Sequence, residues 1–411
     1  MPEDGRQGHS LPRQRSVPDL DAVRTANRGR VLAAIRESGS IARVEIAKAT
    51  GMSAGTVSVI TAQLLEEGLI RQDLGEAEPG QPGRPKSNLS LDPQATFAIG
   101  LKLSLHQIAV SVTNYLGDIV LDDVVPVRLR GLMPEKVVSL CATAIDSVVS
   151  RSGIARERIA GVGIGVPGWV RVRSGMIHWN PIFTAREVPL RRMMEEATGL
   201  PVAMDNDANL VGLAELWFGV GRAERDFIVV TVEHGVGMAL VLDRKIYRGS
   251  DGFAAELAHT KIEIGGALCR CGQRGCLEAY VADYAVMREA ATFFDATHLD
   301  DPLAVQAAIE KLSAAVEAGD LAARDIFERA GALLGIGIAN AAKIVNPSLV
   351  IIAGERARAP AVFFDAVRRS LAAQALVPGV GVPRVQVHRW GDELWARGAA
   401  ALVLETFDVG R

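Results

Sequence analysis

Three cysteines and one histidine in the second half of the chain have the types and spacing of metal ligands. They are His259, Cys269, Cys271 and Cys276. Three thiolates and one imidazole fill the tetrahedral shell of Zn²⁺ and leave no position for a catalytic water, so we expect a structural zinc site. Glycines at positions 272 and 275 let the backbone turn tightly around the ion. The alternative is a group of buried or redox-active cysteines.

The overall composition is that of an ordinary globular protein. The chain has 411 residues, of which 49% are hydrophobic and 23% charged, and its fourth cysteine, Cys141, stands alone. At roughly 100–200 residues per domain, this length predicts several domains. The net charge is −3, so any contact with nucleic acid must come from a local arrangement. The chain has no apolar run long enough for a membrane span and no signal-peptide core, so we expect a cytoplasmic protein without a membrane partner.

The N-terminal part has the pattern of a helix-turn-helix. Helical periodicity is found at residues 24–38, 43–50 and 53–67. In the third of these helices Val57, Ile60 and Leu64 share the predicted buried face, and Ser53 can cap its start. A tight turn at Gly51 separates the last two helices, which is the helix-turn-helix arrangement.

A predicted β-hairpin follows the three helices. Two short alternating runs, at 69–72 and 88–91, flank a segment rich in glycine and proline, which is typical of a wing. We therefore expect a winged helix-turn-helix DNA-binding domain at residues 21–92, after a flexible tail at 1–20.

The exposed face of the third helix determines how this domain would read DNA. Its predicted contact residues are Ser53, Ala54, Thr56, Ser58 and Val59. None has a side chain that reads guanine or adenine bidentately, so we expect contacts with thymine methyl groups in the major groove. Arg84 and Lys86 in the wing suit a narrow minor groove; the alternative is a solvated turn. Because 12 basic residues balance 12 acidic ones up to residue 95, we expect a homodimer or a dimer of dimers on double-stranded operator DNA.

The rest of the chain contains two similar runs of strands. The first comprises strands at 97–103, 107–113 and 119–127, a helix at 134–150 and a buried strand at 159–166; the second begins with strands at 227–232, 238–242 and 246–248. Helices from residue 301 onward and a strand at 349–353 follow. This duplication predicts two α/β lobes that face a cleft, where ligands commonly bind.

Four segments after residue 97 stand out: residues 163–168 (GIGVPG), 205–209 (DNDAN) and 255–259 (AELAH), and the cysteine segment through Glu278. On these segments, the chain from residue 97 onward resembles the ROK family (repressor, open reading frame, kinase), a group of sugar kinases and sugar-responsive repressors. Residues 83–85 (GRP) in the wing resemble the repressor branch of that family.

The resemblance implies an α/β fold, with the winged helix-turn-helix followed by a two-lobed, actin-like (ribonuclease H-like) ROK domain of the ATPase type. We place the small lobe at residues 96–206, completed by a C-terminal helix at about 391–409. The large lobe with the zinc site is placed at 207–390.

The resemblance also implies a sugar site in the cleft. Its residues would be Asn206, Asp207, Glu256, His259 and Glu278. Carboxylates, an amide and an imidazole match the hydroxyl groups of a sugar, each of which donates and accepts a hydrogen bond. His259 would bind zinc with one ring nitrogen and face the sugar with the other. Trp169, His178, Trp179 and Asn180 lie where sugar selectivity could be set, although Trp179 could equally belong to the core.

The sequence departs from the family's kinases where phosphate is bound. Those kinases carry Asp-x-Gly-x-Thr after the first strand, and this chain has KLSLH at 102–106. Their Gly-Thr-Gly is replaced by Glu233, His234 and Gly235, and their later Gly-Gly by Gly354 and Glu355. Asp207 matches the base of the kinases, but without phosphate loops we expect no catalytic residues and no enzyme activity.

These features predict a DNA-binding transcriptional regulator of carbohydrate metabolism genes, and specifically a repressor that is controlled by a sugar or sugar phosphate. One alternative is a bifunctional sugar kinase with a DNA-binding head, which would need intact phosphate loops. The other is a DNA-binding protein with a vestigial sugar lobe, which would have lost the hydroxyl-binding residues that this chain retains.

Overall fold

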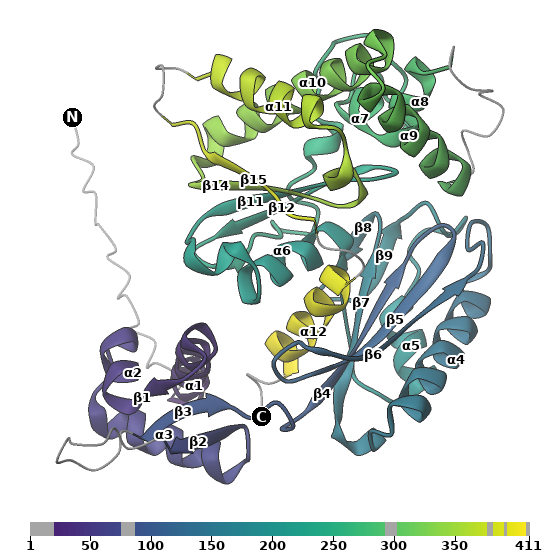
Figure 1. The fold of residues 1–411 in the computed structure, drawn as a ribbon. Helices are drawn as coiled ribbons and strands as arrows, with labels where there is room; N and C mark the ends of the chain where they lie inside the picture. The colour runs from purple at the N-terminus through teal and green to yellow at the C-terminus, as the bar shows by residue number, and fades with distance from the viewer. Residues whose placement is uncertain (1–19, 75–86, 292–301, 376–380, 390–392, 408–411) are drawn as a thin grey trace, which may run out of the picture.

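The computed structural model describes residues 20–74, 87–291, 302–375, 381–389 and 393–407. A small N-terminal head lies beside two larger sheets with their helices (Figure 1). The predicted tail and the wing tip, including Arg84 and Lys86, lie outside the described residues.

The head (residues 20–91) is a winged helix-turn-helix. Its elements are α1 (Leu20–Ser38), β1 (Ile41–Ala42), α2 (Arg43–Thr50), α3 (Ala54–Glu66), β2 (Ile70–Leu74) and β3 (Ser87–Leu91). Gly51 adopts a left-handed φ of 68° between α2 and α3, which glycine tolerates without strain. Ser53 caps α3, because its Oγ accepts a hydrogen bond of 3.1 Å from the Thr56 N–H. β2 and β3 form the predicted hairpin, and the two-residue β1 pairs with β3 as a third strand.

The buried face of α3 differs from the prediction at one position. Val57 and Leu64 are fully buried, but Ile60 is only half-buried, and the polar Thr61 is fully buried instead. The Thr61 hydroxyl accepts a hydrogen bond of 3.0 Å from the Arg43 Nε–H, which compensates for its loss of water. Apolar periodicity alone would not assign a threonine to the core.

The first large sheet has the strand order β10-β7-β4-β5-β6. Its strands are β4 (Phe97–Leu103), β5 (Gln107–Asn114), β6 (Ile119–Pro126), β7 (Ile159–Val166) and β10 (Val202–Asn206), and α4 (Pro134–Ser152) and α5 (Leu190–Thr198) connect them. β4, β5 and β6 are antiparallel, whereas β7 and β10 run parallel to β4. A hairpin of β8 (Trp169–Arg171) and β9 (Met176–Trp179), which periodicity did not indicate, follows β7.

The second large sheet repeats this arrangement in the order β13-β12-β11-β14-β15. Its strands are β11 (Phe227–Val232), β12 (Val236–Leu242), β13 (Lys245–Ile246), β14 (Leu349–Ala353) and β15 (Arg384–Val387). β11, β12 and β13 are antiparallel, and β14 and β15 run parallel to β11. The two sheets therefore have the same topology, as the duplicated sequence pattern predicted.

Two helices lie between the large sheets in Figure 1, α6 (Asp207–Trp217) and α12 (Glu393–Phe407). α12 packs against α6, β4 and β7. Glycine permits this close approach, because a Cβ atom at Gly163 would lie 2.2 Å from the carbonyl oxygen of Ala399. The C-terminal helix thus returns to the first sheet, and α6 runs alongside it.

The remaining α-helices lie on the side of the second sheet that faces away from α6 (Figure 1). They are α7 (Glu278–Val281), α8 (Asp283–Glu289), α9 (Pro302–Glu317), α10 (Leu321–Val345) and α11 (Ala361–Ala373). Short 3-10 helices occur along the chain at Arg156–Arg158, Val220–Ala223, Leu257–His259 and Glu355–Arg358. Phe327 of α10 and Phe363 of α11 are fully buried in the core beside β11 and β14. None of the helices in the described ranges is long and apolar enough to cross a lipid bilayer.

Candidate functional site

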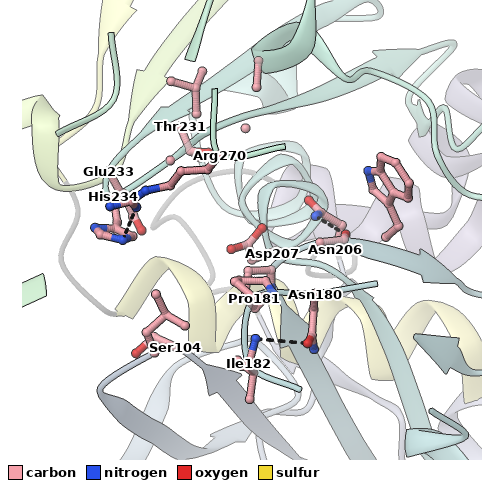
Figure 2. A pocket seen from close by; sticks show the side chains of 18 of the residues that line it. Ser104, Asn180, Pro181, Ile182, Asn206, Asp207, Thr231, Glu233, His234 and Arg270 are labelled. Carbon is pink, nitrogen blue, oxygen red and sulfur yellow. Dashed lines mark hydrogen bonds between the residues drawn. The ribbon is translucent and has the colours of Figure 1, made fainter. Parts of the chain in front are cut away.

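A cavity of about 710 Å³ lies between the two large sheets. Its walls come from the end of β4, the segment after β7, the start of α6 and the loops after β11 and β13. All five residues predicted for a sugar site line this one cavity: Asn206, Asp207, Glu256, His259 and Glu278. Figure 2 shows the part around Asn206 and Asp207, with Glu233, His234 and Arg270 across from them.

The junction of β10 and α6 positions Asn206 and Asp207. The Asn206 Oδ1 caps α6 by accepting a hydrogen bond of 2.9 Å from the Ala208 N–H. The Asn206 amide donates to the carbonyl oxygen of Gly168 at 2.9 Å, so the side chain has a fixed orientation. The side-chain oxygen and the side-chain nitrogen of Asn206 can each make one further hydrogen bond. Asp207 follows directly as the first residue of α6.

The carboxyl group of Asp207 is partly protonated near neutral pH. Burial, together with the nearby negative charge of Glu233, raises its pKa from 3.8 to about 7, while the charge of Lys102 opposes the shift. A carboxyl group with such a pKa can donate as well as accept a hydrogen bond at pH 7. This is the chemistry that a sugar hydroxyl requires of its partner.

Glu256, in the loop after β13, and Glu278, the first residue of α7, provide two further carboxyl groups in the cavity wall. Burial raises the pKa of Glu256 from 4.5 to about 7, and the indole N–H of Trp169 opposes this by donating to the ionised carboxylate. The charge of Glu278 adds to the increase. The Tyr284 hydroxyl donates to the Glu278 Oε1 at 3.2 Å, which orients that carboxylate.

His259 and the three neighbouring cysteines form one cluster. The ligand atoms of His259, Cys269, Cys271 and Cys276 all lie within 4.8 Å of one another. The His259 Nδ1 faces the Cys269 Sγ at 3.8 Å, whereas its Nε2 lies 4.0 Å from the Glu256 Oε2. The imidazole therefore connects a group that could hold a metal ion to the wall of the cavity.

The cysteine loop is folded tightly, as its glycines predicted. Gly275 has a φ of 75°, and a Cβ atom there would lie 1.8 Å from the carbonyl oxygen of Glu263. The Gly272 N–H donates to the Cys269 carbonyl at 2.9 Å, which closes the turn between the cysteines. Cys141 lies elsewhere in the core, where burial raises its thiol pKa to about 12. Burial also raises the thiol pKa of Cys269, so the clustered cysteines differ from Cys141 in their proximity to one another and to His259.

A lysine–glutamate pair lines the cavity at two of the positions where the sequence departs from the kinase pattern. The Lys102 Nζ lies 3.7 Å from the Glu233 Oε2 and 3.9 Å from the centre of the Trp395 ring. A Cβ atom at Gly354 would lie 2.9 Å from the Glu233 Cγ, so the glycine makes room for this side chain. The carboxylate of Glu233 is thus paired with a cation, and the guanidinium of Arg270 contacts the ring of the neighbouring His234 (Figure 2).

The predicted DNA contacts on α3 are all exposed. They are Ser53, Ala54, Thr56, Ser58 and Val59. Val59 is 61% exposed, although an isoleucine or valine on a helix usually faces the core. An exposed branched apolar side chain beside small residues is suited to contact with thymine methyl groups.

Two contacts between segments that are far apart in the sequence were not predicted. The bond between Trp169 and Glu256 joins segments that no motif relates. Arg36 of the head stacks 3.9 Å from the centre of the Trp217 ring at the end of α6. The tryptophan directly after the GIGVPG segment was the only sequence signal for the first contact, and the second had none.

Comparisons with known proteins identify the two parts of the chain. Residues 98–406 match the ROK family, and residues 24–71 match a winged helix-turn-helix DNA-binding family. A putative xylose repressor of Caldicellulosiruptor sp. (strain Rt8B.4) is 30% identical over 389 residues, which cover 93% of this chain and 96% of that protein. The DNA-binding transcriptional repressor Mlc of Escherichia coli (strain K12) is 27% identical over 365 residues, covering 87% of each chain.

Solved structures agree with this assignment. A ROK family transcriptional regulator described as a homolog of E. coli Mlc has a TM-score of 0.79 at 24% identity, covering 94% of this chain and 97% of that one. The ROK hexokinase of Thermus thermophilus has a TM-score of 0.63 at 32% identity, covering 76% and 100% respectively. Because the family match extends over most of the chain, the protein belongs to the ROK family and carries a winged helix-turn-helix at its N-terminus.

Proposed function

We propose that this protein is a transcriptional repressor of carbohydrate metabolism genes whose DNA binding responds to a sugar or sugar phosphate. Its relatives named as repressors align with nearly the whole chain, head included. The head supplies the DNA-binding element, and the cavity between the sheets supplies a site for a small polar ligand.

One observation favours a sugar-sensing repressor over a sugar kinase. The cavity keeps the five hydroxyl-binding side chains, whereas Glu233 and Lys102 form an ion pair on the side where ATP would approach. A site that binds sugar but repels polyphosphate is suited to sensing the sugar rather than converting it. In this proposal Asp207 accepts or donates a hydrogen bond to the sugar and performs no catalysis.

We assign a structural zinc ion to His259, Cys269, Cys271 and Cys276. Three sulfur donors and one imidazole match the tetrahedral preference of zinc, and the short spacing of their ligand atoms supports this assignment. Zinc bound here would fix the ring of His259, so that its other nitrogen is directed at the sugar site.

The operator would be bound by two heads of a homodimer, or by a dimer of dimers. Residues Ser53, Ala54, Thr56, Ser58 and Val59 would enter the major groove, and Arg84 and Lys86 of the wing would enter the minor groove. Charge in the head is balanced, so two half-sites would be needed for tight binding.

Regulation would come from a movement of two lobes, the small one at 96–206 with the C-terminal helix and the large one at 207–390. A sugar that contacts both walls of the cavity favours one arrangement of the lobes, and hence one spacing of the two heads. Such coupling is typically 1–3 kcal/mol, or about 5–150-fold in operator affinity.

A thermal-shift screen of zinc-loaded protein tests the proposal. The panel contains neutral sugars, sugar phosphates and ATP with magnesium, because a ligand that binds the native state raises Tm. We expect one sugar class to raise Tm and to change operator affinity in an anisotropy titration, and ATP to do neither. A protein that responds to no sugar would be a DNA-binding protein with a vestigial lobe.

The second candidate is a bifunctional sugar kinase with a DNA-binding head. Two observations favour it: the 32% identity to a ROK hexokinase, and Asp207, whose pKa of about 7 suits a general base. The test is release of ADP from magnesium ATP in the presence of the sugar that raises Tm. Turnover that disappears in Asp207→Asn would establish the kinase and overturn the repressor-only proposal.

A further inference from the structure

The β8–β9 hairpin brings an aromatic side chain to the wall of the cavity. Trp169 is the first residue of β8, lies opposite Trp179 in β9, and lines the cavity. Its indole ring is held on several sides. His178 stacks on it with a centroid distance of 6.0 Å and an interplanar angle of 13°, and Phe253 lies 5.8 Å away.

The supporting aromatic residues lie behind the indole rather than in front of it. Neither His178 nor Phe253 is among the described residues that line the cavity, whereas Trp169 is. Glu187 accepts a hydrogen bond from the His178 Nδ1, which fixes the imidazole in the stack. The indole is therefore a rigid plate, supported from outside and open to the cavity.

Trp169 and the glycine before it interact with two of the predicted sugar residues. The residue before it, Gly168, accepts a hydrogen bond from the Asn206 amide at 2.9 Å. Its own indole N–H donates to the carboxylate of Glu256. Asn206 ends a strand of the first sheet, and Glu256 belongs to the loop after the second sheet's β13, so Trp169 lies where the two walls of the cavity meet.

The loop that carries Glu256 is packed closely against this hairpin. Gly252 has a φ of 92°, and a Cβ atom there would lie 2.4 Å from the carbonyl oxygen of Val170. The guanidinium of Arg171 lies 5.8 Å from the centre of the Phe253 ring. The relative positions of Trp169 and Glu256 are thus fixed by backbone packing as well as by their hydrogen bond.

We propose that Trp169 is a specificity-determining residue on which the C–H face of a pyranose ring stacks, and that its indole N–H holds Glu256 for the hydroxyl groups at the ring edge. This inference rests on the proposed sugar-sensing function and adds a surface to it. A sugar ring has hydroxyl groups at its rim and C–H groups on its faces, so recognition needs polar side chains around the rim and an aromatic plate against one face. The predicted polar residues provide the contacts around the rim but no aromatic surface for the face of the ring.

Trp179 is the matched control for this proposal. It also lines the cavity and lies 6.0 Å from Trp169, but its ring is tilted by 59°. The indole N–H of Trp169 lowers the pKa of Glu256, and Trp179 is not among the groups that shift this pKa. Replacing either ring by phenylalanine removes one indole from the cavity wall, and only the change at Trp169 removes the N–H that holds Glu256.

The experiment compares Trp169→Phe, Trp169→Ala and Trp179→Phe with the wild type in the zinc-loaded, full-length protein. The probes are D-xylose, D-glucose and N-acetyl-D-glucosamine, which differ at C6 and C2 and share a pyranose ring. Binding is measured by calorimetry and by tryptophan fluorescence, and the indole N–H resonances are recorded by NMR without sugar. Thermal unfolding of each variant shows that it is folded.

We expect Trp169→Ala to weaken binding of the sugar that the wild type binds by about 10-fold or more, and Trp169→Phe by a smaller factor, because phenylalanine keeps an aromatic face. The fluorescence change on sugar binding should disappear in both variants and persist in Trp179→Phe. Without sugar, Glu256→Gln should move the indole N–H resonance that Trp169→Phe removes.

Two results would overturn the proposal while leaving the sugar-sensing function intact. One is wild-type affinity for the sugar in Trp169→Ala, and the other is a fluorescence change that depends on Trp179 instead. If the wild type binds neither these three sugars nor any sugar or sugar phosphate of the thermal-shift panel, the sugar-sensing function itself is refuted together with the stacking role. The NMR result then reports separately on whether Trp169 contacts Glu256.

Discussion

The guanidinium of Arg36 lies 3.9 Å from the centre of the Trp217 ring, so the DNA-binding head is stacked on the last residue of α6. The first residue of the same helix is Asp207, which lines the cavity. The Tyr115 ring, from the turn after β5, lies 5.7 Å from the same guanidinium. Arg36 therefore lies against both the turn between β5 and β6 and the helix that begins at the cavity.

This arrangement predicts that Arg36→Ala weakens the communication between sugar and DNA. A cation–π contact contributes about 0.5–2 kcal/mol, and its loss would leave the head less firmly attached to α6. We expect the ratio of operator affinities with and without sugar to fall by about 2-fold to 30-fold, while sugar binding itself is unchanged. Anisotropy titrations with an operator fragment, with and without saturating sugar, measure this ratio.

Arg24→Ala is the control for that measurement, because Arg24 is an exposed cation on the same helix. It should leave the ratio unchanged. The idea fails if Arg36→Ala and Arg24→Ala behave alike, or if Arg36→Ala changes the affinity for sugar as much as the affinity for DNA.

The second prediction concerns the cysteine cluster. Purified protein should contain one zinc ion per chain, and Cys271→Ser should lose it while Cys141→Ser retains it, because only the clustered thiols face a common centre. Removal of zinc by a chelator should lower Tm by more than about 5 °C and weaken sugar binding, since His259 would lose its fixed orientation. Elemental analysis by mass spectrometry and thermal unfolding are the measurements; equal zinc content in both cysteine variants would contradict the assignment.

The third prediction concerns pH. The pKa of Asp207 is raised from 3.8 to about 7 in the folded protein, so between these values the folded state holds a proton that the unfolded state has released. Its contribution to stability is therefore greatest at low pH and is lost as pH rises from about 4 to about 7. Asp207→Asn removes this dependence.

We expect Asp207→Asn to have nearly the wild-type stability at pH 5 and to be more stable at pH 8 by roughly 1–3 kcal/mol, a range reduced for partial solvent screening. Urea unfolding at the two pH values without sugar gives the difference. Asp251→Asn, at an exposed carboxylate, controls for general charge effects. If the stability difference between Asp207→Asn and the wild type does not grow with pH, the pKa of Asp207 is not raised in the folded protein.

Strong local patterns in the sequence predicted most of the fold. The strands β7 and β14 begin and end where the buried apolar runs do, because five to eight consecutive apolar or small residues leave little choice. The two-residue β1 and the three-residue β8 were missed, since a period cannot be recognised over so few positions. Pairing with β3 and β9 forms these strands, and pairing depends on the tertiary structure.

The candidate site was predictable where its residues lie close together in sequence. Asn206 with Asp207, and His259 with the cysteines, belong to compact motifs, and the structure brings them to one cavity. The contact of Trp169 with Glu256 could not be predicted, because it joins two segments through a hydrogen bond that depends on how the sheets face each other. The same applies to the ion pair of Lys102 and Glu233, whose residues the sequence showed only as separate departures from the kinase pattern.

The fourth prediction concerns the wing. Arg84 lies between a glycine and a proline in the sequence, which suits an extended arginine in a narrow minor groove. Arg84→Ala should weaken operator binding by about 10-fold or more and reduce the preference for A·T-rich flanks. Titrations with operators that carry A·T or G·C flanks test this. Lys86→Ala should weaken binding to both operators to a similar degree, as the loss of a phosphate contact would. An Arg84→Ala protein that still discriminates between the two flanks as the wild type does would rule out minor-groove reading by Arg84.

The fifth prediction concerns the exposed apolar residue of the recognition helix. Val59 is 61% exposed on α3, and Val44 is 65% exposed on α2, so the two valines form a matched pair in the same head. Val59→Ser should lower operator affinity by about 5-fold to 30-fold, because a hydroxyl replaces the methyl groups that would contact thymine. Val44→Ser should leave it unchanged. Since both side chains are exposed, neither change should alter Tm appreciably. Replacing the contacted thymine by uracil, which lacks only the methyl group, should weaken wild-type binding and leave Val59→Ser unaffected; loss of affinity in both proteins would mean that another residue contacts that base.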